Sequence, residues 1–158
     1  MEAILALGSN LGDRWSALAT AASELREWDE DLALSSVYET APVGGPDGQG
    51  PYLNCVARAE VRATPEALLA YCQELEQRAG RVRTERWGAR TLDIDILFLG
   101  DLAIDTPGLT VPHPRWAERA FVLVPLADIA PARVGERLAG LDTDGVRRVG
   151  ELLSGVIA

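Results

Sequence analysis

The sequence contains no lysine, and all 15 of its basic residues are arginine. The lysine of a Walker A phosphate loop, the ATP-binding lysine of protein kinases and the lysine of a Schiff-base mechanism are therefore absent. His113 is the only histidine, so a metal site built from several histidines is excluded as well. These absences remove several enzyme classes before any motif is considered.

Cysteine is scarce, and long hydrophobic runs are missing. Cys55 and Cys72 lie in segments with an apolar pattern, which favours buried free thiols over a disulfide or a metal site. No apolar run approaches the roughly 20 residues of a membrane-spanning helix, and the acidic start MEAILALGSN does not resemble a secretory signal. With a length of 158 residues, we expect one domain over residues 1–158, in a cytoplasmic monomer that binds no membrane.

The charge is unevenly distributed along the chain. The net charge of −9 argues against binding to nucleic acid. The run RAGRVRTERWGAR at residues 78–90 nevertheless holds five arginines and one glutamate, which makes it +4 and leaves −13 on the remainder. Such a basic segment in an acidic protein indicates a local anionic ligand, although a solvated arginine-rich loop would give the same pattern.

Apolar periodicity predicts alternating strands and helices. The predicted strands cover residues 3–7, 32–40, 52–62 and 91–101, with side chains alternating between two faces throughout. Helices are predicted after the N-caps Asp13 and Thr64. A short helix is predicted near PLADIAP, residues 125–131, and a last amphipathic helix within DGVRRVGELL, residues 144–153. The order βαββαβ fits an α+β fold with a ferredoxin-like core sheet, helices packed on one face, and an irregular and helical C-terminal extension.

The segment TLDIDILFLGD, residues 91–101, contains a pair of acids in an otherwise apolar strand. One predicted row of side chains is apolar and comprises Leu92, Ile94, Ile96 and Phe98. The other row begins with carboxylates and then turns apolar: Asp93, Asp95, Leu97 and Leu99. At ~3.3 Å per residue the two aspartates stand about 6.6 Å apart on one face.

Paired carboxylates at this spacing can bind one hard cation or bridge two, and Mg²⁺ shared with substrate phosphates suits them. A solvated strand end with mild charge repulsion would explain the same pair. Arg90 lies three residues before Asp93, so cationic and metal-binding groups adjoin in the chain. Phosphoryl transfer needs both, which favours a site of that kind.

Other features are weaker when each is considered alone. Tyr52 and Asn54 share one face of a predicted strand, where a ring and an amide suit a flat heterocycle, but a half-exposed tyrosine beside an asparagine is common. His113, between two prolines, could simply hold a turn. The loop GSNLG follows a strand and precedes a helix, as anion-binding loops do, but it matches neither common glycine-rich motif.

The motifs together carry a specific resemblance. LGSNLGDR, YETAPVG, YLN, RWGARTLDIDILFLG, TVPHPR and RAFVLVPLADIAP occur in this order between residues 3 and 131. They resemble the 6-hydroxymethyl-7,8-dihydropterin pyrophosphokinase family of folate biosynthesis. The pattern R-W-G-x-R-T-x-D-x-D is highly specific, and the remaining motifs support it.

The resemblance implies transfer of the intact pyrophosphoryl group of ATP to the hydroxymethyl oxygen of a reduced pterin, leaving AMP. It implies two Mg²⁺ ions held by Asp93 and Asp95. The residues implied around the transferring group are Arg81, Arg83, Arg90 and Trp87. The residues implied around the pterin are Thr40, Pro42, Val43, Tyr52, Asn54 and Phe121. The residues implied around ATP are Gln73, Glu76, Arg83, Arg90, Ile96, Thr110, His113 and Arg119.

Some positions depart from the family pattern, and two other functions remain open. Ala89 stands where the family usually has proline, Ala41 also differs, and Gly108 removes a nucleotide-contacting arginine found in some members. A palm-like nucleotidyltransferase would also use paired aspartates on a ferredoxin-like sheet, but it would release pyrophosphate rather than AMP. A non-catalytic ligand-sensing domain would bind without turnover and would tolerate Asp95→Asn.

Overall fold

The computed structural model describes residues 1–41, 50–80 and 91–152. Its main element is an antiparallel six-stranded sheet with the order β5-β1-β4-β3-β8, in which the short β2 also pairs with β4. The strands are β1 (Glu2–Ser9), β2 (Ala33–Leu34), β3 (Val37–Thr40), β4 (Tyr52–Glu60), β5 (Asp93–Leu99) and β8 (Val146–Gly150). A separate small hairpin pairs β6 (Ile104–Asp105) with β7 (Thr110–Val111).

The first two helices follow the predicted caps. α1 (Arg14–Arg26) begins after Asp13, whose carboxylate accepts a hydrogen bond from the Ser16 N–H at 3.0 Å. α2 (Pro65–Arg78) begins after Thr64, whose hydroxyl oxygen accepts one from the Ala67 N–H at 3.1 Å. Both predictions are confirmed.

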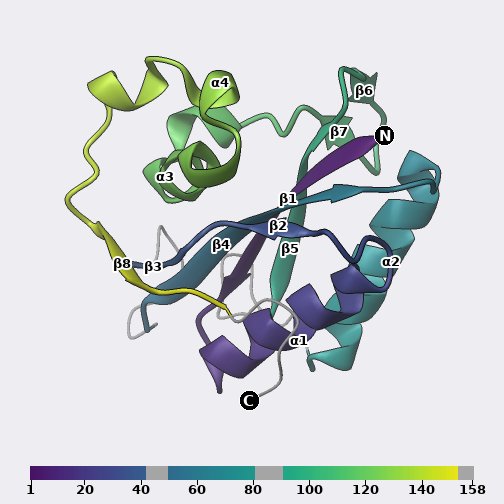
Figure 1. Ribbon diagram of the computed structural model, residues 1–158, viewed down its shortest axis with the longest axis horizontal. Helices are drawn as coiled ribbons and strands as arrows, with labels where there is room; N and C mark the ends of the chain where they lie inside the picture. The colour runs from purple at the N-terminus through teal and green to yellow at the C-terminus, as the bar shows by residue number, and fades with distance from the viewer. Residues whose placement is uncertain (42–49, 81–90, 153–158) are drawn as a thin grey trace.

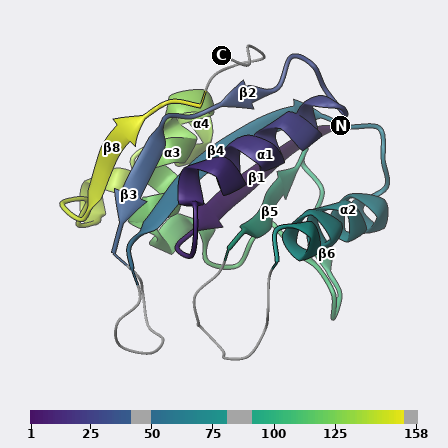
Figure 2. The same ribbon diagram turned by 90° about the horizontal axis from the view of Figure 1, so that it is seen from below.

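The two helices of the βαββαβ order pack on one face of the sheet, as expected, and further helices cover the other face (Figures 1 and 2). α1 and α2 lie on one face and share a buried core with it that includes Leu5, Leu18 and Leu68. α3 (Ala120–Ile129) and α4 (Pro131–Val134) lie on the other face, where a second core forms. The predicted short helix near PLADIAP is therefore the end of α3, a longer helix whose apolar side chains require a sheet face to bury them.

The predicted side-chain rows of β5 hold as far as Leu97 and fail for Phe98 and Leu99. Ile94 and Ile96 face the core beneath α1 and α2 as predicted, but Phe98 faces the α3 core and Leu99 faces the α1–α2 core. The pairing with β1 shifts register here, from Ile4 opposite Phe98 to Leu5 opposite Ile96. This bulge inserts one residue and exchanges the faces of all residues beyond it.

A similar irregularity divides the strand predicted over residues 32–40. Leu34 and Val37 both pack against the α1–α2 core, which strict alternation does not allow. Between them the Val56 N–H donates to the Ser35 hydroxyl oxygen at 2.8 Å, and the Ser35 N–H donates to the Val56 carbonyl oxygen at 2.9 Å. A serine hydroxyl competing for ladder hydrogen bonds breaks the regular pairing.

The helix predicted within residues 144–153 is wrong, because residues 146–150 form β8. Val146 and Val149 have a spacing that fits a helix, but this segment pairs with β3, placing Arg147 directly opposite Glu39. Their side chains form an ion pair of 2.8 Å. Pairing across more than 100 residues of sequence overrides the local pattern. In the described parts of the chain, no helix is long and apolar enough to cross a membrane.

Candidate active site

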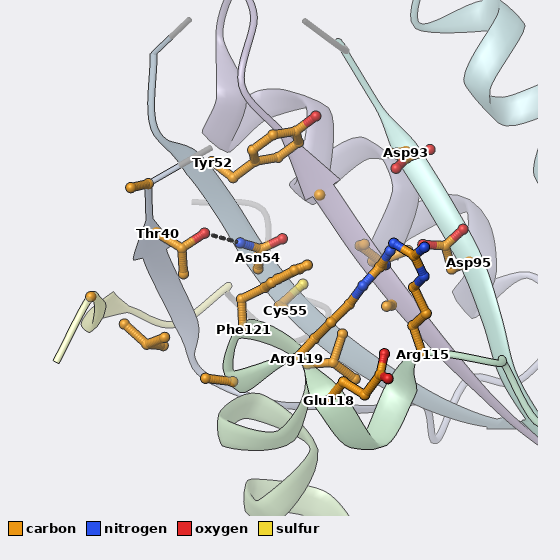
Figure 3. A pocket seen from close by; sticks show the side chains of 18 residues that line it. Thr40, Tyr52, Asn54, Cys55, Asp93, Asp95, Arg115, Glu118, Arg119 and Phe121 are labelled. Atoms are coloured by element: carbon orange, nitrogen blue, oxygen red, sulfur yellow. Dashed lines mark hydrogen bonds between the residues drawn. The ribbon is translucent and has the colours of Figure 1, made fainter. Parts of the chain in front are cut away.

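A cavity of about 650 Å³ opens on the α3 side of the sheet, at the end where β4 and β5 begin. Its floor comes from β1, β3, β4 and β5, and its walls come from the start of α3 and from β8 (Figure 3). The lining includes the following residues implicated by the sequence: Thr40, Tyr52, Asn54, Asp93, Asp95, Arg119 and Phe121. Segments far apart in the chain therefore meet at one site.

The two aspartates form the acidic end of this cavity. Asp93 and Asp95 lie opposite Gly8 and Ala6 of β1, and both side chains are half-buried on the cavity face. Two adjacent carboxylates suit Mg²⁺, which prefers oxygen ligands and usually keeps places for water or phosphate. In the described segments, no group of three or more His, Cys, Asp or Glu side chains could hold a metal ion. A cation bound here would therefore need further oxygen ligands from substrate or water.

The aromatic end of the cavity combines two rings with an amide. Tyr52 and Asn54 project from β4, and Phe121 projects from the first turn of α3. In Figure 3 the two rings lie on either side of the Asn54 amide. The amide nitrogen of Asn54 donates to the buried Thr40 hydroxyl at 2.7 Å, which orients its carbonyl oxygen. A flat heterocycle can stack on these rings and hydrogen-bond to this amide edge.

Gly8 provides the space in which the Asn54 side chain lies. A Cβ atom at this position would lie 3.0 Å from Asn54 Oδ1 and 3.4 Å from Tyr52 Cδ1. The Gly8 backbone has an ordinary strand pairing with Asn54, so the need for glycine is steric rather than conformational. The glycine of the GSNLG loop thus has a role that the spacing of its motif does not reveal.

Arginines form the wall opposite the floor of the sheet. The Arg119 guanidinium lies 5.4 Å from the centre of the Phe121 ring, within range of a cation–π contact. Figure 3 shows the side chains of Arg115 and Arg119 extending toward Asp95. This arrangement places positive groups beside the aspartates, as binding of a metal–phosphate group requires.

His113 lies beside the cavity without lining it. Its N–H donates to the Leu97 carbonyl oxygen at 3.0 Å, and its Nδ1 accepts from the Arg115 N–H at 3.1 Å. Burial, and after it the charge of Arg119, lowers the pKa of His113 below its ordinary value. The histidine is therefore neutral at pH 7 and holds the turn that carries Arg115.

The other residues implied around ATP are spread over the surroundings of β5. Gln73 is exposed on α2, whereas Glu76 is buried against β5. Ile96 is buried in the α1–α2 core, and Thr110 is exposed in β7. Gly108 is exposed, with no neighbouring atom near its missing side chain. Six further predicted residues lie outside the described parts of the chain: Pro42, Val43, Arg81, Arg83, Trp87 and Arg90.

Several cavity residues are absent from the set derived from the sequence. Arg115 belongs to the TVPHPR motif, so its position next to His113 could have indicated it. Glu118 precedes Arg119 and had no such signal. Gly145 and Val146 come from the turn before β8 and from its first residue, where a helix was predicted, so only the folded structure places them at the site.

Comparison with known proteins gives a consistent result. Residues 4–131 match the family model described as 7,8-dihydro-6-hydroxymethylpterin-pyrophosphokinase (HPPK). A protein of Methylorubrum extorquens named 2-amino-4-hydroxy-6-hydroxymethyldihydropteridine pyrophosphokinase is 42% identical over 94% of this chain and 98% of its own length. The Bacillus subtilis protein of the same name is 43% identical, over 92% of this chain and 88% of its own length.

Solved structures with the same fold are longer than this chain. The chain is similar to Plasmodium falciparum HPPK-DHPS, with a TM-score of 0.58 and 15% identity over 93% of the chain. It spans 47% of that protein, or less than half. A second structure, described as HPPK-DHPS in complex with substrates, gives a TM-score of 0.57 at 15% identity, over 82% of this chain and 40% of the other. At these identities the likeness shows the fold alone.

Proposed function

Because this chain belongs to the 7,8-dihydro-6-hydroxymethylpterin-pyrophosphokinase family, we propose that it transfers pyrophosphate from ATP to 6-hydroxymethyl-7,8-dihydropterin in folate biosynthesis. The hydroxymethyl oxygen forms a bond to the β-phosphorus and loses its proton to solvent, the bond from that phosphorus to the α-phosphate oxygen breaks, and AMP leaves. The observation that carries this proposal is one cavity that joins an aromatic and amide end to a paired-carboxylate end. A pterin ring and a metal-bound triphosphate need these two ends side by side.

The aromatic end holds the pterin in this proposal. Tyr52 and Phe121 take the two faces of the ring, and Asn54 hydrogen-bonds to its polar edge. Thr40 keeps the Asn54 amide in one orientation through their 2.7 Å hydrogen bond. Pro42 and Val43 are assigned to the same wall on the family resemblance. Fixing the ring in this way brings the hydroxymethyl group toward Asp93 and Asp95.

The acidic end would hold Mg²⁺ and the phosphates in this proposal. When bound, Mg²⁺ neutralises phosphate charge and orients the transferred group. Asp93 and Asp95 would be its protein ligands, with two ions expected on the family resemblance. Arg119 supports the polyphosphate from the opposite wall, and the nucleotide is assigned on the family resemblance to the surroundings of β5, with Gln73, Ile96, Thr110 and His113.

Electrostatic positioning supplies most of the catalysis in this proposal. His113 forms hydrogen bonds with backbone groups and does not line the cavity. It is therefore a poor candidate for a general base. Arg81, Arg83, Arg90 and Trp87, outside the described residues, are assigned to the transferring group on the family resemblance. Preorganised positive groups stabilise the charge that spreads over a transferring phosphoryl group.

We also propose the fold topology, domain number, oligomeric state and location that the sequence leads us to expect. The strand order β5-β1-β4-β3, with its antiparallel pairings, supports a ferredoxin-like core. Residues 1–158 would act as a single domain, in a cytoplasmic monomer that binds ATP and a reduced pterin but no nucleic acid or membrane. Light scattering after size-exclusion chromatography tests the monomer directly.

Product analysis tests the function. The protein is incubated with ATP, Mg²⁺ and 6-hydroxymethyl-7,8-dihydropterin, and the nucleotides are separated; AMP should appear only when the pterin is present. Formation of ADP, or no turnover by folded protein, would contradict the reaction. Release of free pyrophosphate would instead indicate a nucleotidyltransferase. Asp95→Asn tests the alternative of a non-catalytic ligand-sensing domain, because such a domain would keep most of its ligand binding after this substitution.

A further inference from the structure

Glu76 is a buried acid on the opposite side of β5 from the cavity. It projects from α2, and only 4% of its surface is exposed. Among the residues that the structure describes, it is the only acidic or basic one buried to this extent. A carboxylate in such a place is costly unless it accepts good hydrogen bonds, so its contacts carry information about its role.

The carboxylate of Glu76 binds the backbone of the strand that carries the aspartates. Its Oε2 accepts a hydrogen bond from the Ile94 N–H at 2.9 Å, in a buried setting. Ile94 lies between Asp93 and Asp95, and β5 is an edge strand of the sheet with β1 on its inner side. The Ile94 N–H therefore points outward, and Glu76 takes the place that a neighbouring strand would have.

The packing around this hydrogen bond separates Glu76 from the cavity. Ile94 points into the α1–α2 core, whereas the side chains before and after it line the cavity. Burial, and after it the charges of Glu76 and Asp95, raises the pKa of Cys72 to about 12. Among the described residues Glu76 does not line the cavity, and its hydrogen bond to the Ile94 N–H links it to the site through the backbone of β5.

We infer that Glu76 is a positioning residue, whose bond to the Ile94 N–H fixes the middle of the Asp93–Asp95 segment so that both carboxylates face the metal–phosphate group together. This role differs from the direct contact with ATP that the family resemblance implies for Glu76. It rests on the proposed function, because the benefit of aligned aspartates is a bound Mg²⁺. Residues that do not touch a metal but orient its ligands through hydrogen bonds are commonly important for metal affinity.

Three substitutions at Glu76 separate the effects of its hydrogen-bond acceptor, its side-chain length and its charge. Glu76→Ala removes the acceptor, Glu76→Gln keeps an acceptor oxygen at the same reach without charge, and Glu76→Asp keeps the charge but withdraws it by one methylene. If Glu76 is a positioning residue, Glu76→Gln should preserve activity best, and Glu76→Asp and Glu76→Ala should lose it. For Glu76→Ala, kcat should fall about 10- to 100-fold and the half-saturating Mg²⁺ concentration should rise in the same range.

Two controls isolate the contact from charge and packing. Glu74→Gln removes an exposed carboxylate from the same helix, where it pairs with Arg78, so it reports the loss of charge alone. Cys72→Ala removes a buried side chain that packs one helical turn before Glu76, so it reports the loss of packing. Both controls should keep kcat and the Mg²⁺ requirement near those of the unaltered protein.

A measurement without substrates makes the inference independent of turnover. Hydrogen exchange of the Ile94 amide, followed by NMR, should be faster in Glu76→Ala and near normal in Glu76→Gln. The inference is overturned if Ile94 exchange and kcat stay unchanged while the KM for ATP rises, or if Glu76→Asp outperforms Glu76→Gln. If Glu76→Ala does not fold, the order of the other two variants decides. If the unaltered protein forms no AMP, the proposed function fails, while Ile94 exchange still tests the contact.

Discussion

Replacing Gly8 by alanine should weaken pterin binding selectively. The new Cβ would lie 3.0 Å from Asn54 Oδ1, about 0.4 Å inside the 3.4 Å at which ordinary contact begins, so the amide must move. The 2.7 Å hydrogen bond from Asn54 to Thr40 would lengthen. The added Cβ would also lie 3.4 Å from Tyr52 Cδ1, so it has little room to move away from Asn54. The substitution therefore disturbs the amide and one ring of the aromatic end together.

The expected size follows from overpacking. Inserting a methyl group into a filled site costs about 1–3 kcal/mol. If most of that cost falls on the pterin complex, which needs the displaced amide, the KM for the pterin should rise about 10- to 100-fold, at 1.4 kcal/mol for each factor of ten. The KM for ATP should stay within about twofold, because the proposed function assigns the phosphates to the other end of the cavity.

Steady-state kinetics with each substrate varied in turn measures this difference. Gly140→Ala is a matched control, since nothing lies within 4 Å of its added Cβ, and it should leave both KM values unchanged. Equal increases in both KM values, or no change in the pterin KM for a folded Gly8→Ala variant, would refute the assignment of Gly8 and Asn54 to the pterin end.

Three other predictions concern separate parts of the molecule. Asp95→Asn should lower kcat by at least about 100-fold, as loss of a metal-positioning carboxylate would, with unchanged circular dichroism; activity near normal would contradict its metal role. The lowered pKa of His113 means that the unfolded chain takes up the proton first, so stability should fall as pH drops below the ordinary histidine pKa of about 6.5. In urea unfolding between pH 7 and 5, His113→Gln should lose less unfolding free energy than the unaltered protein. An equal loss would exclude His113 as the cause. Tyr38→Phe removes a 2.8 Å hydrogen bond to Asp128 and should cost about 1–2 kcal/mol of unfolding free energy with little effect on kcat. Because burial and Asp128 raise the pKa of Tyr38 to about 12, the stability it contributes is present below about pH 10 and is lost as pH rises toward 12, a loss that the Phe variant should lack.

Local signals in the sequence determined much of the chain's secondary structure. Asp13 and Thr64 cap the helices where predicted, because capping depends on residues within one helical turn. The face of β4 that carries Leu53 and Cys55 is buried as its alternation predicts. The aspartate pair was also recognisable, since its spacing and its neighbouring arginines lie within a short run of residues.

Long-range pairing decided the features that were predicted wrongly. The segment 146–150 became a strand because β3 offered a free edge and Glu39 a partner for Arg147, neither of which is visible locally. The bulge in β5 depends on its register with β1, and it exchanged the faces of Phe98 and Leu99. A hydrophobic pattern specifies that a side chain is buried, but not on which side of a sheet another helix will cover it.

The family could thus be inferred from short motifs, and a hypothesis for the chemistry of the site came from the same motifs, because their residue types and spacing are visible in the sequence alone. Tertiary structure alone decided how the site is assembled and supported. It placed Arg115 and Val146 around the cavity, gave Gly8 its steric role beside Asn54, and put Glu76 behind the aspartates instead of in the cavity. Each of these roles depends on a contact between segments far apart in the chain, and such contacts exist only once the sheet has formed.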